Sequence, residues 1–337
     1  MSPDITLESI RAYRDYHDKL YWSPPDFHRD LDEHITGQDE AKRIASTVLY
    51  NHLEGRPSVT LFHGNTGCGK TELWRVLQKD FHMIYIFDSS TMSAEGWSGS
   101  NKLSSLLRQV KPEWRRNAIL VFDEFDKLIT PRYASGGGGW NTSLLLQEQL
   151  LKMCDHDILY FGAERESPAF SLNCEGVSIV FLGAFSALKK QKAEQKQAIG
   201  FSKSIQKKGT ANTLTIQDII DFGLMPELAG RIMRIVQMDD LTVQDYIQIG
   251  ANEVRHLEEM YKKPIQYDPS ILVMLARMAI NEGLGARFIK HKLRIMIEDT
   301  TQYYDPSVEA ITLTYQHEGA FPYDEDEPML CTPKPVT

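Results

Sequence analysis

Residues Gly64 to Thr71 have the types and the spacing of a loop that binds phosphate. They read Gly-Asn-Thr-Gly-Cys-Gly-Lys-Thr, which fits the pattern G-x-x-x-x-G-K-[ST] at every fixed position. In such a loop the backbone N–H groups turn inward around the phosphates, the lysine reaches the β- and γ-phosphates, and the last hydroxyl binds Mg²⁺. We therefore expect a nucleoside triphosphate to contact this loop from its second position onward: Asn65, Thr66, Gly67, Cys68, Gly69, Lys70 and Thr71.

Two adjacent carboxylates supply the second part of this chemistry. Asp123 and Glu124 directly follow the apolar run Ile119–Phe122, which predicts a buried strand. Ligands of parallel α/β sheets bind at the carboxyl ends of the strands, so both side chains are expected at the nucleotide. Asp123 would join Thr71 in holding Mg²⁺, and Glu124 would polarise the water that attacks the γ-phosphate. The predicted activity is the hydrolysis of ATP, with Mg²⁺ as cofactor.

Short apolar strands alternate with helices over residues 26–238, and this pattern predicts the frame that positions these groups. The phosphate loop lies between a predicted strand and the predicted helix Glu72–Lys79, which is the context the motif requires. Alternation of this kind predicts an α/β domain with a mostly parallel sheet and helices on both faces. The predicted strands are Ser58–Phe62, Ile84–Phe87, Ile119–Phe122 and Val177–Leu182.

The sequence on either side of this region has a different character. Residues 1–25 predict a short helical arm closed by Ser23-Pro24-Pro25. Residues 239–317 predict a small, mostly α-helical domain, and the acidic tail 318–337 is expected to be disordered. The expected elements of the small domain are helices Thr242–Tyr261, Ser270–Asn281 and Ala286–Tyr304 and a strand Ala310–Tyr315.

Two segments interrupt the regular pattern of the large domain. Ser135–Trp140 contains four consecutive glycines, which disfavour any fixed backbone conformation. Lys189–Thr213 is polar and rich in lysine and is expected to be a long loop. Long loops inside compact domains are usually functional or disordered.

Composition excludes several classes of function. The net charge of −9 disfavours nucleic acid as a partner, since DNA-binding proteins usually carry a basic surface. The sequence has no apolar run long enough to span a membrane and no secretory signal, so we expect a cytoplasmic protein. The four scattered cysteines form no zinc module, and no nucleophile motif of a protease is present.

From Phe27 to about Tyr315 the chain resembles the ClpX family of hexameric AAA+ unfoldases, motif by motif and in order. The resemblance implies an AAA+ large nucleotide-binding domain and a small helical lid domain. Leu31–Ala41 is similar to the family's segment that packs on adenine, which places His34 and Ile35 at the nucleotide. Phe122–Lys127 is similar to its hydrolytic strand end.

Two arginines take their expected roles from the same resemblance. Asp221–Arg231 is similar to the family's arginine-finger segment, so Arg231 is expected to reach the γ-phosphate of a neighbouring subunit. A cation from a neighbour suits the charge-spread transition state of phosphoryl transfer. Gly285-Ala286-Arg287 is similar to the sensor-2 motif, in which Arg287 would touch phosphate within its own subunit.

The resemblance also implies a pore that grips polypeptide. Ala94–Gly99 corresponds to the family's pore loop, so that Gly96, Trp97, Ser98 and Gly99 would line the pore, with tryptophan in place of the usual tyrosine. Arg132–Asn141 corresponds to a second pore loop but is unusually rich in glycine.

Two departures from the family concern how substrates are recognised. The basic loop at the family's pore entrance corresponds here to Gly162–Ser167, a shorter segment with two carboxylates. We expect this entrance not to favour carboxylate-ended degradation tags. The family's N-terminal zinc-binding domain is also expected to be lacking.

The tripeptide Ile199-Gly200-Phe201 matches the one by which the family docks onto its barrel peptidase. The leading interpretation is thus a ring-forming, ATP-dependent unfoldase, expected as a homohexamer, that threads polypeptide through its pore and can deliver it to a ClpP-like peptidase. The alternative is a dedicated remodeller or assembly factor that acts on one protein complex without proteolysis. A nucleic-acid motor is disfavoured by the net charge.

Overall fold

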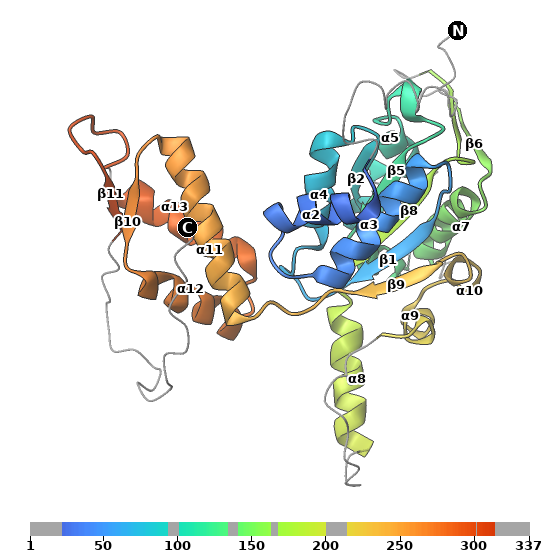
Figure 1. Ribbon diagram of the computed structural model, residues 1–337. Helices are drawn as coiled ribbons and strands as arrows, with labels where there is room; N and C mark the ends of the chain where they lie inside the picture. The colour runs from blue at the N-terminus through green and yellow to red at the C-terminus, as the bar shows by residue number, and fades with distance from the viewer. Residues whose placement is uncertain are drawn as a thin grey trace.

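The computed structural model describes residues 22–93, 101–133, 141–162, 168–199, 214–300 and 302–313 (Figure 1). Several predicted segments therefore lie outside the described residues. They include most of the expected arm 1–25, the loop around Trp97, the glycine-rich loop, Gly200 and Phe201, and the expected tail 318–337.

The centre of the fold is a five-stranded parallel sheet in the order β2-β5-β8-β1-β9. Its strands are β1 (Val59–His63), β2 (Ile84–Asp88), β5 (Ile119–Asp123), β8 (Ser178–Gly183) and β9 (Arg234–Gln237). The first four were predicted, and the predicted α/β fold is confirmed. Strand β9 was not predicted, because it is an edge strand in which Val236 alone is fully buried, so no apolar run marks it.

Aromatic side chains show that helices pack on both faces of the sheet. Phe62 of β1 contacts Trp74 of α4 (Lys70–Asp80), with ring centroids 5.8 Å apart. Phe181 of β8 stacks on Phe125 of α6 (Phe125–Ile129) at 4.1 Å. Phe181 is paired in register with Leu61, and neighbouring side chains along a strand point to opposite faces. The helices α4 and α6 therefore cover opposite faces of the sheet.

Most of the remaining elements of this part lie around the sheet, whereas α8 (Ser186–Ile199) projects away from it (Figure 1). Two short strand pairs are separate from it: β3 (Met92–Ser93) with β4 (Asn101–Lys102), and the antiparallel pair β6 (Ile158–Phe161) with β7 (Phe170–Asn173). Two 3₁₀ turns are η2 (Ser89–Thr91) and η3 (Pro112–Trp114). The other helices are α2 (Pro24–His34), α3 (Asp39–Leu53), α5 (Leu103–Leu107), α7 (Thr142–Cys154), α8 (Ser186–Ile199), α9 (Ile216–Phe222) and α10 (Pro226–Ala229).

A second cluster of buried side chains lies among the C-terminal helices. It is built by α11 (Val243–Tyr261), α12 (Pro269–Asn281), α13 (Ala286–Thr300) and the parallel pair β10 (Ile265–Tyr267) and β11 (Ile311–Leu313). Thr242 caps α11 through the N–H of Asp245, and Asp268 caps α12 ahead of Pro269. The expected boundary between residues 238 and 239 stays a proposal.

One local prediction is wrong. Lys189–Thr213 is not a loop throughout, because its first part belongs to α8, where lysine, glutamine, alanine and glutamate favour helix. Pro24 and Pro25 begin α2, where a proline needs no N–H partner, and the helical arm expected before them lies outside the described residues. Ser23 precedes them, and its N–H donates to the carboxylate of Asp26 at 2.9 Å.

Candidate nucleotide site

The loop Gly64–Gly69 and the carboxylate of Asp123 meet at the carboxyl edge of the sheet. The loop follows β1, Asp123 ends β5, and β8 lies between these two strands. Thr71 in the first turn of α4 donates its hydroxyl to Asp123 Oδ2 at 2.6 Å. The structure therefore brings together the two residues expected to hold Mg²⁺. Hard oxygen ligands this close fit a small octahedral cation, whose ligand distances are about 2.0–2.1 Å.

Lys70 places a positive charge inside the loop. The residue is buried, and its Nζ donates to the carbonyls of Gly64 at 2.7 Å and Asn65 at 2.8 Å. The N-terminus of α4 begins at the same residue and adds the favourable end of its dipole. Together these groups form an anion site of the kind that the motif predicts.

Glu124 follows Asp123 in a conformation that L-residues rarely adopt. Its φ is +55°, and its backbone N–H donates to Asp123 Oδ1 at 2.9 Å. The side chain is exposed beside the Thr71–Asp123 pair. A carboxylate that stands free at a strand end can accept a proton from a water molecule at the γ-phosphate. Backbone strain of this kind is often found at functional sites.

The segment that contains Arg287 lies against the phosphate loop. Gly285 is buried and has φ +69°, and an added Cβ on Gly67 would lie only 2.6 Å from the Cα of Gly285. Arg287 itself is exposed at the start of α13, and within the described part of the chain its guanidinium has no hydrogen-bond or ion-pair partner. The helix thus begins at the loop with an arginine free to reach a ligand.

Arg231 lies at a different surface. It follows α10, is about half exposed, and forms an ion pair through Nε with Asp155, the residue after α7. The hydrogen bond from this guanidinium to Asp155 raises the pKa of Arg231 further above its ordinary value. The structure therefore does not bring Arg231 to the phosphate loop of its own chain.

The segment between α2 and α3 reaches the loop through a residue that the sequence analysis did not single out. Gln38 is buried with φ +63°, and its amide donates to the carbonyls of Cys68 at 3.2 Å and Asp239 at 2.8 Å. It also accepts from the N–H of Asp239 at 2.9 Å. Of the residues expected at adenine, Ile35 is buried, whereas His34 is exposed and bonded to the Asp30 carbonyl.

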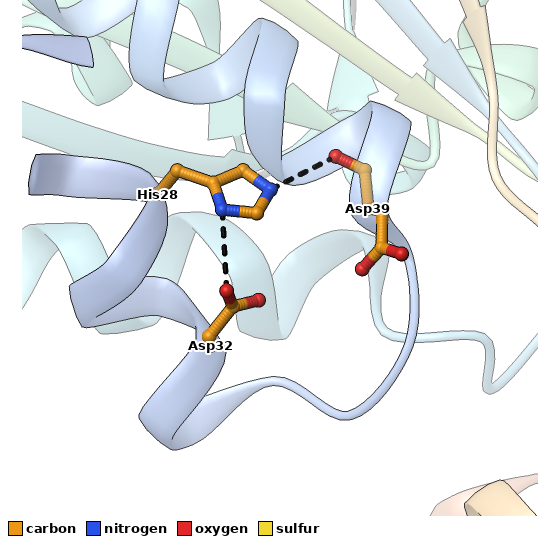
Figure 2. Close-up of side chains that lie close together, drawn as sticks. All are labelled: His28, Asp32 and Asp39. Atoms are coloured by element: carbon orange, nitrogen blue, oxygen red, sulfur yellow. Dashed lines mark hydrogen bonds and ion pairs between the residues drawn. The ribbon is translucent and has the colours of Figure 1, made fainter. Parts of the chain in front are cut away.

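A polar cluster joins α2 and α3 on this side of the site (Figure 2). His28 contacts the carboxylate of Asp32 at 3.2 Å and the backbone oxygen of Asp39 at 3.3 Å, and one ligand atom from each residue falls within 4.8 Å of the others. The buried ammonium of Lys42 bonds to Asp32 and lies 3.2 Å from Asp39. The single ammonium offsets part of the negative charge of the two carboxylates, and these contacts tie α2 to α3.

Two further polar residues next to the loop also escaped the sequence analysis. Lys189 in α8 donates to Asn65 Oδ1 at 2.9 Å, and His63 ends β1 with a completely buried ring. Burial, with Lys189 and Lys70 nearby, lowers the pKa of His63 to about 4. For Lys189 the sequence offers one signal, its position shortly after a buried strand of a parallel sheet. We interpreted that part of the sequence as a loop.

The predicted pore and docking residues cannot be placed in the same way. Gly96, Trp97, Ser98 and Gly99 lie outside the described residues, and so do Gly200 and Phe201. Ile199 is the last residue of α8. Within the described residues, no helix combines the length and the apolar character needed to cross a membrane.

Comparisons with known proteins agree with this geometry. Residues 60–160 match the family described as ATPase family associated with various cellular activities (AAA). The ATP-dependent Clp protease ATP-binding subunit ClpX 2 of Wolinella succinogenes is 24% identical over 340 residues, which cover 92% of this chain and 84% of that protein. The ATP-dependent Clp protease ATP-binding subunits ClpX of Treponema denticola and Borrelia duttonii are 26% and 25% identical, over 85% and 93% of this chain and 78% and 82% of theirs.

Proposed function

We propose that this chain, a ClpX-like AAA+ ATPase, uses ATP hydrolysis to unfold proteins as a ring that threads polypeptide through a central pore. The observation that carries this proposal is the extent of the similarity. The AAA match covers residues 60–160, whereas the ClpX relatives match 85–93% of the chain. Similarity over this length includes the C-terminal helices and not the ATP-binding loop alone.

Within one subunit, the chain's own residues divide the work of hydrolysis. Lys70 and the loop amides bind the phosphates, and Thr71 and Asp123 would hold Mg²⁺, which neutralises phosphate charge when it is bound. Glu124 takes the proton of the attacking water, and Arg287 contacts phosphate from α13. The close approach of Gly285 to Gly67 supports this role of Arg287, because it brings the start of α13 to the loop.

A second subunit completes the site in this proposal. Arg231 is exposed and points to a surface whose neighbours include apolar residues, with Met233 69% exposed. A largely apolar groove is formed by residues that flank Arg231 in the sequence, and its lining is Ile216, Ile220, Pro226, Ala229, Gly230, Ile232, Met233, Arg234 and Ile235. An apolar face around an arginine suits contact with another copy of the chain, in which Arg231 would reach the neighbour's γ-phosphate.

Polypeptide is the proposed substrate, gripped by Trp97 in a pore formed by a homohexamer. The relatives' printed names describe subunits of an ATP-dependent protease. They support delivery to a ClpP-like peptidase, for which Ile199-Gly200-Phe201 would be the docking tripeptide.

A dedicated remodelling activity without proteolysis is the second candidate. The observation in its favour is the pair of carboxylates, Glu164 and Glu166, in the segment expected at the pore entrance. Negative charge there would repel carboxylate-ended tags and leave the ring to act on another class of protein.

Substrate trapping separates the two candidates. Glu124→Gln should bind ATP without hydrolysing it, so that its rings retain both substrates and any peptidase. Recovery of a barrel peptidase with diverse polypeptides supports the first candidate, and recovery of one defined complex supports the second. A control, Lys70→Ala, should bind ATP weakly and trap nothing. Continued hydrolysis by Glu124→Gln would exclude Glu124 as the base.

A further inference from the structure

We propose that Lys189 is a second phosphate-binding cation of the nucleotide site and contacts the γ-phosphate of bound ATP. Its Nζ donates to Asn65 Oδ1 at 2.9 Å, and Lys70 Nζ donates to the backbone carbonyl of the same residue at 2.8 Å. Two ammonium groups thus flank one residue of the phosphate loop. The inference rests on the binding of ATP at this loop.

The fold holds Lys189 at this place through the turn between β8 and α8. The turn between β8 and α8 is fixed by the buried carboxylate of Asp126, which accepts from the N–H groups of Ala184 and Phe185 at 3.2 Å each. The N–H of Lys189 then bonds to the carbonyl of Phe185 at 2.9 Å. Lys189 therefore projects from the first turn of a helix that begins at the carboxyl edge of the sheet, where phosphates bind.

Lys70 and Lys189 bring two positive charges to the loop, and two carboxylates, Asp240 and Asp126, lie near Lys189 without an ion pair to it in the described part of the chain. Burial and the nearby Lys70 lower the pKa of Lys189, whereas the carboxylates of Asp240 and Asp126 act in the opposite direction. Within the described part of the chain, neither Lys70 nor Lys189 forms an ion pair, since both donate to oxygens of Gly64 or Asn65. Partly buried charges are normally paired, and a triphosphate would pair with both ammonium groups.

His63 provides a second observation in the same region. Its ring is completely buried, and in the described part of the chain both ring nitrogens are without a hydrogen-bond partner. Buried polar groups are nearly always hydrogen-bonded, so this pair of nitrogens points to a polar ligand or its hydration shell. The ring lies close enough to Lys70 and Lys189 for their charges to lower its pKa.

The competing reading is that Lys189 only ties α8 to the loop through Asn65. The two readings differ in which nucleotide they affect. A structural tie would change the affinities for ADP and for ATP alike, because it acts on the shape of the loop. A cation on the γ-phosphate acts on a group that ADP lacks.

The test measures the equilibrium binding of ADP and of a non-hydrolysable β,γ-imido analogue of ATP to Lys189→Met, Lys189→Arg and Lys190→Met. Lys190 is the exposed neighbour in the same helix and serves as the matched control. We expect Lys189→Met to bind the triphosphate analogue about tenfold more weakly or worse, as for one lost hydrogen bond to a charged group. ADP should change little, Lys189→Arg should restore most of the affinity, and Lys190→Met should behave as wild type.

Two results would overturn the proposal. If Lys189→Met loses the same affinity for both nucleotides, Lys189 only maintains the conformation of the loop. If its affinity for both is unchanged, Lys189 has no role in nucleotide binding. Neither result bears on the ATP site itself, which Lys70→Ala tests separately, because that change should weaken both nucleotides.

Discussion

Gly67 of the phosphate loop and Gly285 before α13 meet backbone to backbone. A Cβ added to Gly285 would lie 2.8 Å from the Cα of Gly67, and one added to Gly67 would lie 2.6 Å from the Cα of Gly285. Real side chains do not approach backbone so closely, so both positions require glycine. The contact joins the sheet and its ATP loop to the C-terminal helices, two residues before Arg287.

Replacing Gly285 by alanine should therefore separate Arg287 from the loop. We expect Gly285→Ala to fold but to hydrolyse ATP roughly tenfold more slowly or worse, a loss of about 1.4 kcal/mol in transition-state stabilisation. Gly283→Ala is the matched control, because Gly283 has a similar φ of +65° with no atom within 4 Å of its Cβ position. Both variants bear the same backbone cost of about 1 kcal/mol. Steady-state turnover and the free energy of unfolding check this, and equal turnover in the two variants would contradict it.

Arg231→Ala should bind ATP with normal affinity and hydrolyse it about a thousandfold more slowly, as expected for a lost arginine finger. Because the finger would act on a neighbouring subunit, mixing Arg231→Ala with Glu124→Gln should restore part of the activity. Each mixed interface can then combine an intact Arg231 with an intact Glu124. Turnover measured across mixing ratios checks this, and activity that stays at the level of the separate variants would exclude action in trans.

Asp155→Ala tests whether the observed ion pair restrains that arginine. The pair is partly exposed, so its loss should change the free energy of unfolding by less than about 1 kcal/mol. Release of Arg231 should alter turnover only in the assembled ring. Turnover measured against protein concentration shows this, and an effect that is independent of concentration would contradict it.

Trp97→Ala should leave ATP turnover largely intact and abolish the unfolding of a protein substrate, because the aromatic side chain that grips the substrate polypeptide is lost. Trp97→Tyr is the conservative control and should retain most unfolding. Parallel assays of phosphate release and loss of substrate fluorescence check the prediction. Intact unfolding by Trp97→Ala would place the grip elsewhere.

His52 should make the protein less stable in mild acid. Its buried ring bonds to Ser178 and to the Asn117 carbonyl, and burial lowers its pKa from 6.5 to about 4. The folded state favours the neutral ring. The contribution of His52 to the free energy of unfolding is therefore complete above pH 6.5 and is lost as the pH falls from 6.5 towards 4. The difference corresponds to about 3 kcal/mol.

Urea unfolding at pH 7 and pH 5 checks the contribution of His52. Between pH 7 and pH 5 the free energy of unfolding should fall by less in the His52→Gln variant than in wild type, although at pH 7 that free energy is already lower in the variant. His63, whose pKa is also lowered to about 4, would account for the acid sensitivity that remains. An unchanged pH dependence in His52→Gln would contradict the prediction.

The sequence was most informative where one local pattern determines one local structure. The glycines of the loop, the apolar run before Asp123 and the caps at Thr242 and Asp268 act over a few residues, and the structure has the corresponding turns, strand and helix starts. Strand β9 could not be predicted from the local sequence, because its formation depends on pairing with β1, which is far away in the chain.

Two of the residues that were missed, Gln38 and Lys189, reach the site through long-range polar contacts. Gln38 contacts Cys68 and Asp239, and Lys189 contacts Asn65. Glutamine and lysine are ordinary surface residues in a sequence, and the position of Lys189 shortly after a buried strand does not by itself show that it contacts a loop more than a hundred residues away. Their roles follow from topology and not from any motif.

Helix α8 extends away from the sheet as a single rod (Figure 1). Its first turn contains Lys189 and its last residue is Ile199, so at 1.5 Å per residue its two ends lie about 20 Å apart. A tilt of about 10° at the nucleotide end would move the far end by roughly 3–4 Å over that length. If Lys189 binds the γ-phosphate and the far end of α8 docks a peptidase, as proposed above, the helix would act as a lever arm, and loss of that phosphate would move the docking end by about the size of a side chain.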